Sequence, residues 1–138
     1  MRTRRFLWLS LCLCWLSACG QSDSVITAKV TGHVTLDGKP LERGLIQFLP
    51  TDGHGSAAAA EIQQGNYAVA VPLGSKRVEV TSPKVVGKQK AYDTPDSPVM
   101  DLIEEQIPWE YNAQSKLQAD VSRERTKFDF AVTSKPAP

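Results

Sequence analysis

Apolar and polar residues alternate through the stretch 26–36 of the chain. One set of alternate positions carries apolar or small residues, namely Ile26, Ala28, Val30, Gly32, Val34 and Leu36. The positions between them carry threonine, lysine or histidine. Because successive side chains of a strand point to opposite faces, this period of two predicts a strand with one buried face.

Six further runs of the same kind follow, separated by glycine-containing turns or longer connections. They cover residues 44–49, 57–62, 67–71, 78–80, 117–121 and 128–132. The first turn, Asp37-Gly38-Lys39-Pro40, combines a glycine that accepts a positive φ with a proline that fixes its own φ. Since no long amphipathic helix interrupts the pattern, we expect an all-β fold, a single antiparallel seven-stranded β-sandwich. A small closed barrel is the structural alternative.

One long segment, residues 83–114, precedes the last two expected strands and is predicted to be a loop. Long ordered loops often carry function, so this segment is the candidate binding site. Tyr92, Trp109 and Tyr111 would form a platform for a sugar or a peptide, with Glu104 and Glu105 among the polar contacts. The alternative is a lid, in which Trp109 and Tyr111 pack over an open end of the sandwich.

Residues 85–90 within this segment could add a further edge strand. Lys84, Lys88 and Lys90 would then keep the edge soluble or touch anionic headgroups, and we favour edge protection.

The first 18 residues have the layout of a secretory signal. Residues 1–5 are basic, and residues 6–16 form an apolar run of eleven residues. As a helix that run is about 16 Å long, against the ~30 Å of a bilayer core, so export and cleavage are favoured over a transmembrane span. Leu16-Ser17-Ala18-Cys19 resembles a lipobox, in which the cysteine thiol accepts a lipid. An ordinary signal peptide that leaves Cys19 free is the alternative.

These features predict the organisation of the whole chain. Residues 1–18 are a cleaved signal peptide, 19–24 a lipidated tether, 25–134 the β-sandwich domain and 135–138 a disordered tail. Diacylglycerol and fatty acyl groups such as palmitate on Cys19 would attach the exported domain to a membrane, since stable anchoring takes two or more acyl chains. The expected location is the periplasmic face of the outer membrane or the cell surface.

Charge and composition exclude several functions. Three of the 16 basic residues precede Cys19, which leaves 13 against 15 acidic residues and a net charge of −2 after cleavage. Nucleic-acid binding therefore has no electrostatic basis. With Cys19 the only cysteine left, no internal disulfide can form. Two histidines and no calcium-loop spacing lead us to expect no metal site and no cofactor beyond the lipid.

Residues 30–41, Val-Thr-Gly-His-Val-Thr-Leu-Asp-Gly-Lys-Pro-Leu, resemble the opening of transthyretin-like, carboxypeptidase-regulatory-like domains. Ile46-Gln47-Phe48-Leu49-Pro50, Ile107-Pro108 and the closing Phe128-Asp129-Phe130 extend the likeness to small lipoproteins of this type abundant in planctomycetes. The resemblance implies architecture and location but no catalytic residues. The C-terminal Tyr-Arg-Gly-Ser of the related 5-hydroxyisourate hydrolases is absent from the sequence.

The functional hypothesis from sequence is a non-enzymatic module anchored in the bacterial envelope. Its partners would be the membrane, through the lipid, and an envelope protein or glycan, through residues 83–114. The competing hypothesis is an envelope enzyme of the hydrolase type that uses the acidic residues of the stretch 93–110.

Overall fold

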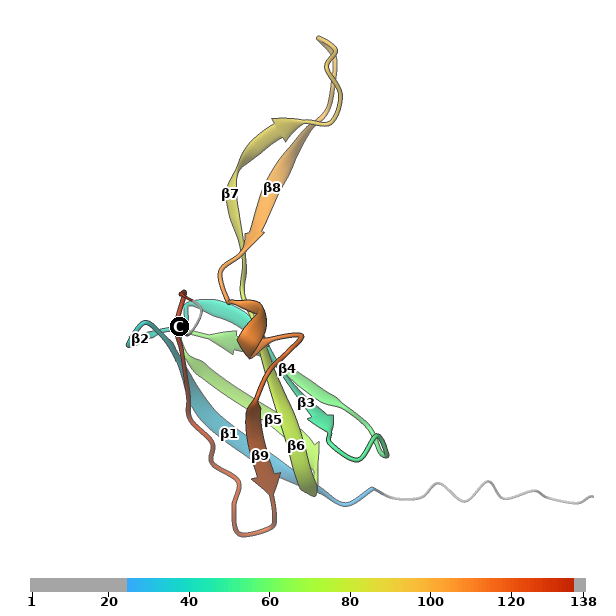
Figure 1. Cartoon of the computed structure of the whole chain (residues 1–138), viewed down its shortest axis with the longest axis vertical. Coiled ribbons are helices and arrows are strands. Elements are labelled where there is room, and N and C mark those ends of the chain that lie inside the picture. The colour runs from blue at the N-terminus through green and yellow to red at the C-terminus, as the bar shows by residue number, and fades with distance from the viewer. Residues whose placement is uncertain (1–24, 136–138) are drawn as a thin grey trace, which may run out of the picture.

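The computed structural model of the protein describes residues 25–135, which form ten strands and one short 3-10 helix (Figure 1). In chain order these elements are β1 (Thr27–Leu36), β2 (Lys39–Pro40), β3 (Arg43–Pro50), β4 (Ala58–Gln63), β5 (Asn66–Pro72), β6 (Gly74–Thr81), β7 (Pro83–Lys90), β8 (Val99–Glu105), η1 (Trp109–Tyr111), β9 (Leu117–Val121) and β10 (Phe130–Val132). The prediction of an all-β fold is confirmed.

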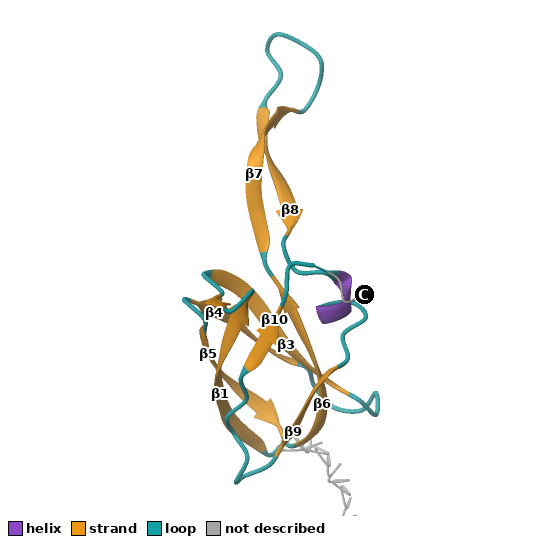
Figure 2. Ribbon diagram, turned by 60° about the vertical axis from the view of Figure 1, so that its left-hand side comes forward, coloured by secondary structure: helices purple, strands orange, loops and turns teal. Residues whose placement is uncertain are grey.

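Eight of the strands form one strongly curved sheet, a half-barrel (Figure 2). Their order is β10-β1-β5-β4-β3-β6-β9, with the short β2 paired to β1. All neighbours in this sheet are antiparallel except β1 and β10, which run parallel with Val34 opposite Phe130. The other two strands, β7 and β8, form a separate antiparallel pair.

The apolar faces of the half-barrel strands meet in one core. Alternation in β1 holds as expected, because Val30 and Val34 are fully buried while Lys29 is exposed. Ile46 and Phe48 of β3 are among the largest fully buried side chains, and the Phe48 ring lies 6.0 Å from the ring of Tyr67. Burial of this kind is the main force holding a small domain without disulfides together.

Two tight hairpin turns set the strand register. Asp37 and Gly38 join β1 to β2, and Gln64 and Gly65 join β4 to β5, each pair with two positive φ angles. Two consecutive positive φ angles match the twist of the flanking strands, and Gly at the second position meets that demand without strain. The Asp-Gly turn predicted from the sequence is therefore present.

The expected long loop before the last two strands is a wrong prediction for most of its length. Residues 83–105 form β7, a tip and β8, and the stretch 106–116 that follows contains η1 but no strand. The loop prediction failed because β7 and β8 carry apolar residues on both faces, so neither strand shows a clean alternation. The suggestion of a strand at residues 85–90 was correct, although it pairs with β8 and not with the edge of the main sheet.

Candidate functional site

The most distinctive feature of the protein is a two-stranded arm that projects from one end of the half-barrel. The arm consists of β7, the tip at residues 91–98 and β8 (Figure 1). From the pair Pro83 and Glu105 at its base to the pair Lys90 and Val99 below the tip, the register spans seven residue steps along β7. At about 3.3 Å per step this is roughly 23 Å, less a little for the bulge between Val85 and Gly87.

Hydrogen bonds close the tip of the arm. The amide of Ala91 donates to the carbonyl oxygen of Pro98 at 2.9 Å, and the amide of Tyr92 donates to the Ser97 hydroxyl at 2.7 Å. The amide of Ser97 in turn donates to the carbonyl oxygen of Thr94 at 3.2 Å. Ser97 is buried by this arrangement, so the tip is an ordered turn.

The arm exposes an unusual number of large apolar side chains. Ile103 is 62% exposed and Val99 is 61% exposed, and four further aliphatic residues of the arm are more than two-fifths exposed: Val85, Val86, Met100 and Leu102. The register distributes these side chains over both faces of the arm. Val85 and Ile103 are cross-strand partners on one face, and Met100 and Leu102 lie on the other. Clustered exposed apolar side chains are a feature of interaction sites on soluble domains.

The two strands of the arm carry side chains of opposite charge. β7 carries Lys84, Lys88 and Lys90, whereas β8 carries Asp101, Glu104 and Glu105. The register places Lys84 opposite Glu104 and Lys88 opposite Asp101. Opposite charges in facing positions are compatible with this strand pairing, although the ion pair found within residues 25–135 lies elsewhere, between Arg77 and Glu79.

Glu105 and Ser82 fasten the arm to the half-barrel. One carboxylate oxygen of Glu105 accepts hydrogen bonds from the amides of Ser82, at 2.7 Å, and Ile107, at 2.9 Å. The Ser82 hydroxyl donates to the carbonyl oxygen of Arg43 at 2.6 Å, and Gln106 donates through its side-chain amide to the Ser82 hydroxyl at 3.1 Å. Ser82 is buried, so this junction is a fixed part of the domain.

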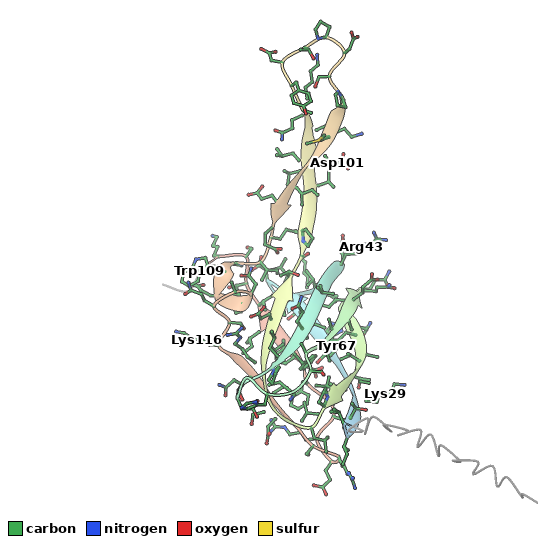
Figure 3. The ribbon with its side chains drawn as sticks, turned by 90° about the vertical axis from the view of Figure 1, so that its right-hand side faces the viewer. Lys29, Arg43, Tyr67, Asp101, Trp109 and Lys116 are labelled. Carbon is green, nitrogen blue, oxygen red and sulfur yellow. The ribbon has the colours of Figure 1, made fainter. Side chains whose placement is uncertain are left out.

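A second candidate feature is a hollow beside η1. It has a volume of about 360 Å³ and is lined by Trp109, Glu110, Tyr111, Gln114, Lys116 and Leu117. Trp109 is 54% exposed, whereas Tyr111 packs against the core and its hydroxyl lies 3.2 Å from the hydroxyl of Thr133. Trp109 and Lys116 are visible on the same side of the half-barrel in Figure 3.

The structure does not bring the three predicted aromatic residues together. Tyr92 is 70% exposed at the tip of the arm, while Trp109 and Tyr111 lie beyond its base, roughly 23 Å away along the strands. The platform of Tyr92, Trp109 and Tyr111 is therefore a wrong prediction. The lid alternative, with Trp109 and Tyr111 packed over the end of the sandwich, agrees with the structure for Tyr111, which packs against the core, but not for Trp109, which is 54% exposed.

The two predicted acidic residues have different surroundings although they are adjacent in sequence. Glu104 lies exposed on β8 opposite Lys84, and Glu105 holds the junction through its two backbone hydrogen bonds. The lipidation site, Cys19, lies outside the described residues, as do the predicted signal peptide 1–18 and the tether 19–24.

Sequence reasoning missed the aliphatic residues of the arm as candidate contacts. The available signal was a pair of strand-length stretches, residues 83–90 and 99–105, on either side of the turn-forming sequence Asp93-Thr94-Pro95-Asp96. Aspartate and proline favour turns, and valine, isoleucine and methionine around them are compatible with strands, so this pattern is typical of a hairpin.

Within residues 25–135, no group of three or more His, Cys, Asp or Glu side chains is arranged to hold a metal ion. No helix in that same range is both long and apolar enough to cross a membrane.

Fold and site together define the class of this protein, an all-β half-barrel that carries a projecting two-stranded arm. No family model matches the chain, and neither a characterised protein nor a solved structure matches it.

Proposed function

We propose that the protein is an exported, lipid-anchored module of the bacterial envelope that binds another envelope component, a protein or a glycan, through its arm and catalyses no reaction. The observation that carries this proposal is the apolar surface of the arm, with Ile103 and Val99 more than three-fifths exposed. Burying such side chains against a partner is favourable at about 25 cal/mol per Å². Without a partner, these side chains remain in contact with water and the stabilisation from their burial is not gained.

The position of the arm supports a role in reaching away from a membrane. The amide of Leu73 donates to the carbonyl oxygen of Ile26, so the first described residues lie beside the start of β6. β6 and β7 then run from that end of the half-barrel to the tip (Figure 1), and the 16 residue steps from Gly74 to Lys90 cover at most about 53 Å. With a lipid on Cys19, the tip would face away from the bilayer.

The sequence features of the amino terminus support the anchor. Leu16-Ser17-Ala18-Cys19 follows a basic start and an apolar run too short to span a bilayer. The six residues 19–24 reach about 20 Å when fully extended, which keeps the half-barrel near the lipid surface. Anchored and oriented in this way, the arm would be the most distant part of the protein.

We infer further that the half-barrel is a variant of the seven-stranded, transthyretin-like sandwich. In support, each of the seven strand runs expected from the sequence coincides with a strand of the curved sheet, namely β1, β3, β4, β5, β6, β9 and β10. The stretch 30–41, which carries the resemblance, forms most of β1, the turn and β2. The arm would then be an insertion between two strands of this framework.

Photo-crosslinking in intact cells tests the proposal. A photo-reactive residue is placed at Ile103 on the arm or, as a control, at Glu61, an exposed residue of the interior strand β4. We expect discrete adducts from position 103 only, in the membrane fraction, and a soluble protein when Cys19→Ala is introduced. Adducts of equal yield from position 61, or none from 103, would contradict binding through the arm, and an unchanged location of Cys19→Ala would contradict the anchor.

A further inference from the structure

The two outer edges of the arm differ in the features that prevent strand pairing. β7 begins with Pro83, has a bulge between Val85 and Gly87, and carries three lysines. Proline, bulges and lysine are the devices by which natural sheets protect an edge. β8 has neither proline nor lysine nor a bulge between Val99 and Glu105. The edge of β7 therefore carries three protecting features, whereas β8 carries only its acidic side chains, which a basic segment would match in charge.

β8 carries apolar residues on both of its faces. Val99 and Ile103 share one face with Asp101, and Met100 and Leu102 share the other face with Glu104, because side chains alternate along a strand. A segment that pairs with the free edge of β8 would place its own side chains beside these apolar residues on both faces, because cross-strand partners share a face. In residues 25–135, β8 pairs on one side only, with β7.

The existing neighbour of β8 shows which side chains suit its acidic positions. Lys84 lies opposite Glu104, and Lys88 lies opposite Asp101, with aliphatic Val85 opposite Ile103 (Figure 3 shows Asp101 partway along the arm). A strand on the other side of β8 would meet the same two carboxylates and the same aliphatic residues. Its basic residues would stand three apart, since Asp101 and Glu104 are three apart and a regular strand has no bulge.

We propose that the outer edge of β8 binds an extended segment of a partner protein, antiparallel to β8, with lysine or arginine opposite Glu104 and Asp101 and aliphatic residues between them. This inference rests on the proposed function, binding through the arm, and names the chemistry of the partner. Backbone hydrogen bonds along the edge would supply affinity, and the spacing basic, aliphatic, aliphatic, basic would supply specificity. A partner of this kind would cover exposed apolar side chains of β8 and oppose its two carboxylates.

Two synthetic peptides serve as probes of this edge. The first is acetyl-Lys-Val-Val-Lys-Val-Thr-amide, which places lysine opposite Glu104 and Asp101 in the antiparallel register, and the second carries glutamate in place of both lysines. Hydrogen–deuterium exchange of the full, membrane-extracted chain reports where each peptide binds. We expect the lysine peptide to slow exchange in β8, and the glutamate peptide to have a much smaller effect.

Matched variants test whether peptide binding depends on the carboxylates of the β8 edge or only on the net charge of the arm. Asp101→Asn with Glu104→Gln removes both edge carboxylates without placing like charges opposite the lysines of β7. We expect this variant to reduce the preference for the lysine peptide by about three- to tenfold, as two lost charge pairs would. Asp93→Asn with Asp96→Asn removes the same charge at the tip, and the preference should remain.

Several outcomes would overturn the inference. The first is slower hydrogen exchange in β7 or in the half-barrel instead of β8. The others are equal binding of both peptides, or loss of the preference for the lysine peptide in Asp93→Asn with Asp96→Asn. Slow exchange in β8 that appears without peptide and rises with protein concentration, together with a dimer in sedimentation, would identify the occupant as a second copy. A further outcome is that neither peptide slows exchange in β8 of the unsubstituted protein, while position 103 still forms adducts there and in Asp101→Asn with Glu104→Gln. This would refute binding at the β8 edge and leave the proposed function intact.

Discussion

β3 of the half-barrel and β8 of the arm are similar in length, at 8 and 7 residues, yet the apolar side chains of β3 are buried or half-buried and those of β8 are exposed. In β3, Ile46 and Phe48 are fully buried inside the curved sheet. In β8, Val99 and Ile103 remain more than three-fifths exposed. The difference lies in the number of neighbours: a curved sheet of eight strands encloses its own core, whereas two strands have no second layer to pack against.

The comparison also separates what each region contributes. A two-stranded ribbon is marginally stable in water by itself, so the order of the arm depends on its junction with the half-barrel. Glu105 and Ser82 supply that junction through hydrogen bonds to the amide of Ile107 and the carbonyl oxygen of Arg43. The half-barrel therefore supplies stability, and the arm supplies accessible surface.

The largest expected contrast is between a core residue and an arm residue of similar character. Phe48→Ala should lower the free energy of unfolding by about 3–5 kcal/mol, because it leaves a cavity in the core beside Tyr67. Ile103→Ala should change it by less than about 0.5 kcal/mol, since Ile103 is exposed. Urea unfolding followed by circular dichroism measures both. Similar losses in the two variants would mean that the arm is packed against a partner in solution.

Two glycines provide a second contrast. An added Cβ at Gly32 of β1 would lie 1.7 Å from the carbonyl oxygen of Phe128, whereas one at Gly87 of β7 would meet nothing within 4 Å. Gly32→Ala should therefore destabilise the protein by about 1–3 kcal/mol or more, by forcing β1 away from the segment before β10.

Gly87→Ala is the matched control for this test and should be nearly neutral in urea unfolding. Rapid hydrogen exchange at the amide of Phe128, which donates to the carbonyl oxygen of Thr31 at 3.0 Å, would locate the damage in Gly32→Ala. An unfolding midpoint unchanged by Gly32→Ala would show that the close approach of the two backbones is absent in solution.

Two adjacent glutamates test the junction. Glu105→Ala removes the acceptor shared by the amides of Ser82 and Ile107, and should cost about 1–3 kcal/mol because a buried donor loses its partner. Glu104 is exposed like Glu105 but accepts no hydrogen bond from a backbone amide within residues 25–135. Glu104→Ala should therefore cost less than about 0.5 kcal/mol. Hydrogen exchange along β7 and β8 should accelerate in Glu105→Ala, and equal exchange in the two variants would argue against a role of Glu105 in holding the arm.

Sequence analysis correctly predicted the elements that depend on residues close to one another in the chain. The alternation in residues 26–36 predicted β1, and Asp37-Gly38 predicted the turn, because both depend on a few neighbouring residues. The parallel pairing of Val34 with Phe130 depends on residues 96 positions apart, and neither strand encodes it locally. Gly32 was a missed signal, since glycine inside a strand often marks a close approach of another backbone.

The candidate site was predicted less well than the fold. The segment 83–114 contains the arm, but the arm was taken for a loop, since Val85-Val86 and Leu102-Ile103 break the alternation that marks a half-buried strand. Tyr92 and Trp109 were grouped by residue type. Their separation is set by the length of β7 and β8, which residue type does not report.

The smallest expected effect concerns Asp37, at the end of the half-barrel from which the arm projects. The amide of Ser134 donates to the Asp37 carboxylate at 3.0 Å, and this hydrogen bond lowers the pKa of Asp37 below its usual value of 3.8. A carboxyl whose pKa is lowered by folding contributes stability above its usual pKa, and loses that contribution as the pH falls through the lowered value. The chemical shift of the Ser134 amide should therefore titrate with a midpoint below 3.8.

Substitution of Asp37 distinguishes titration of this hydrogen bond from unfolding of the whole domain in acid. Asp37→Asn keeps an acceptor and tolerates the positive φ at this turn, so the Ser134 amide shift should become independent of pH. Asp52, whose pKa is lowered by the amide of His54, is the internal control and should titrate unchanged in the variant. A midpoint at or above 3.8 for Ser134 in the unsubstituted protein would mean that the chain end is not held to the turn in solution, and that the half-barrel ends at β10.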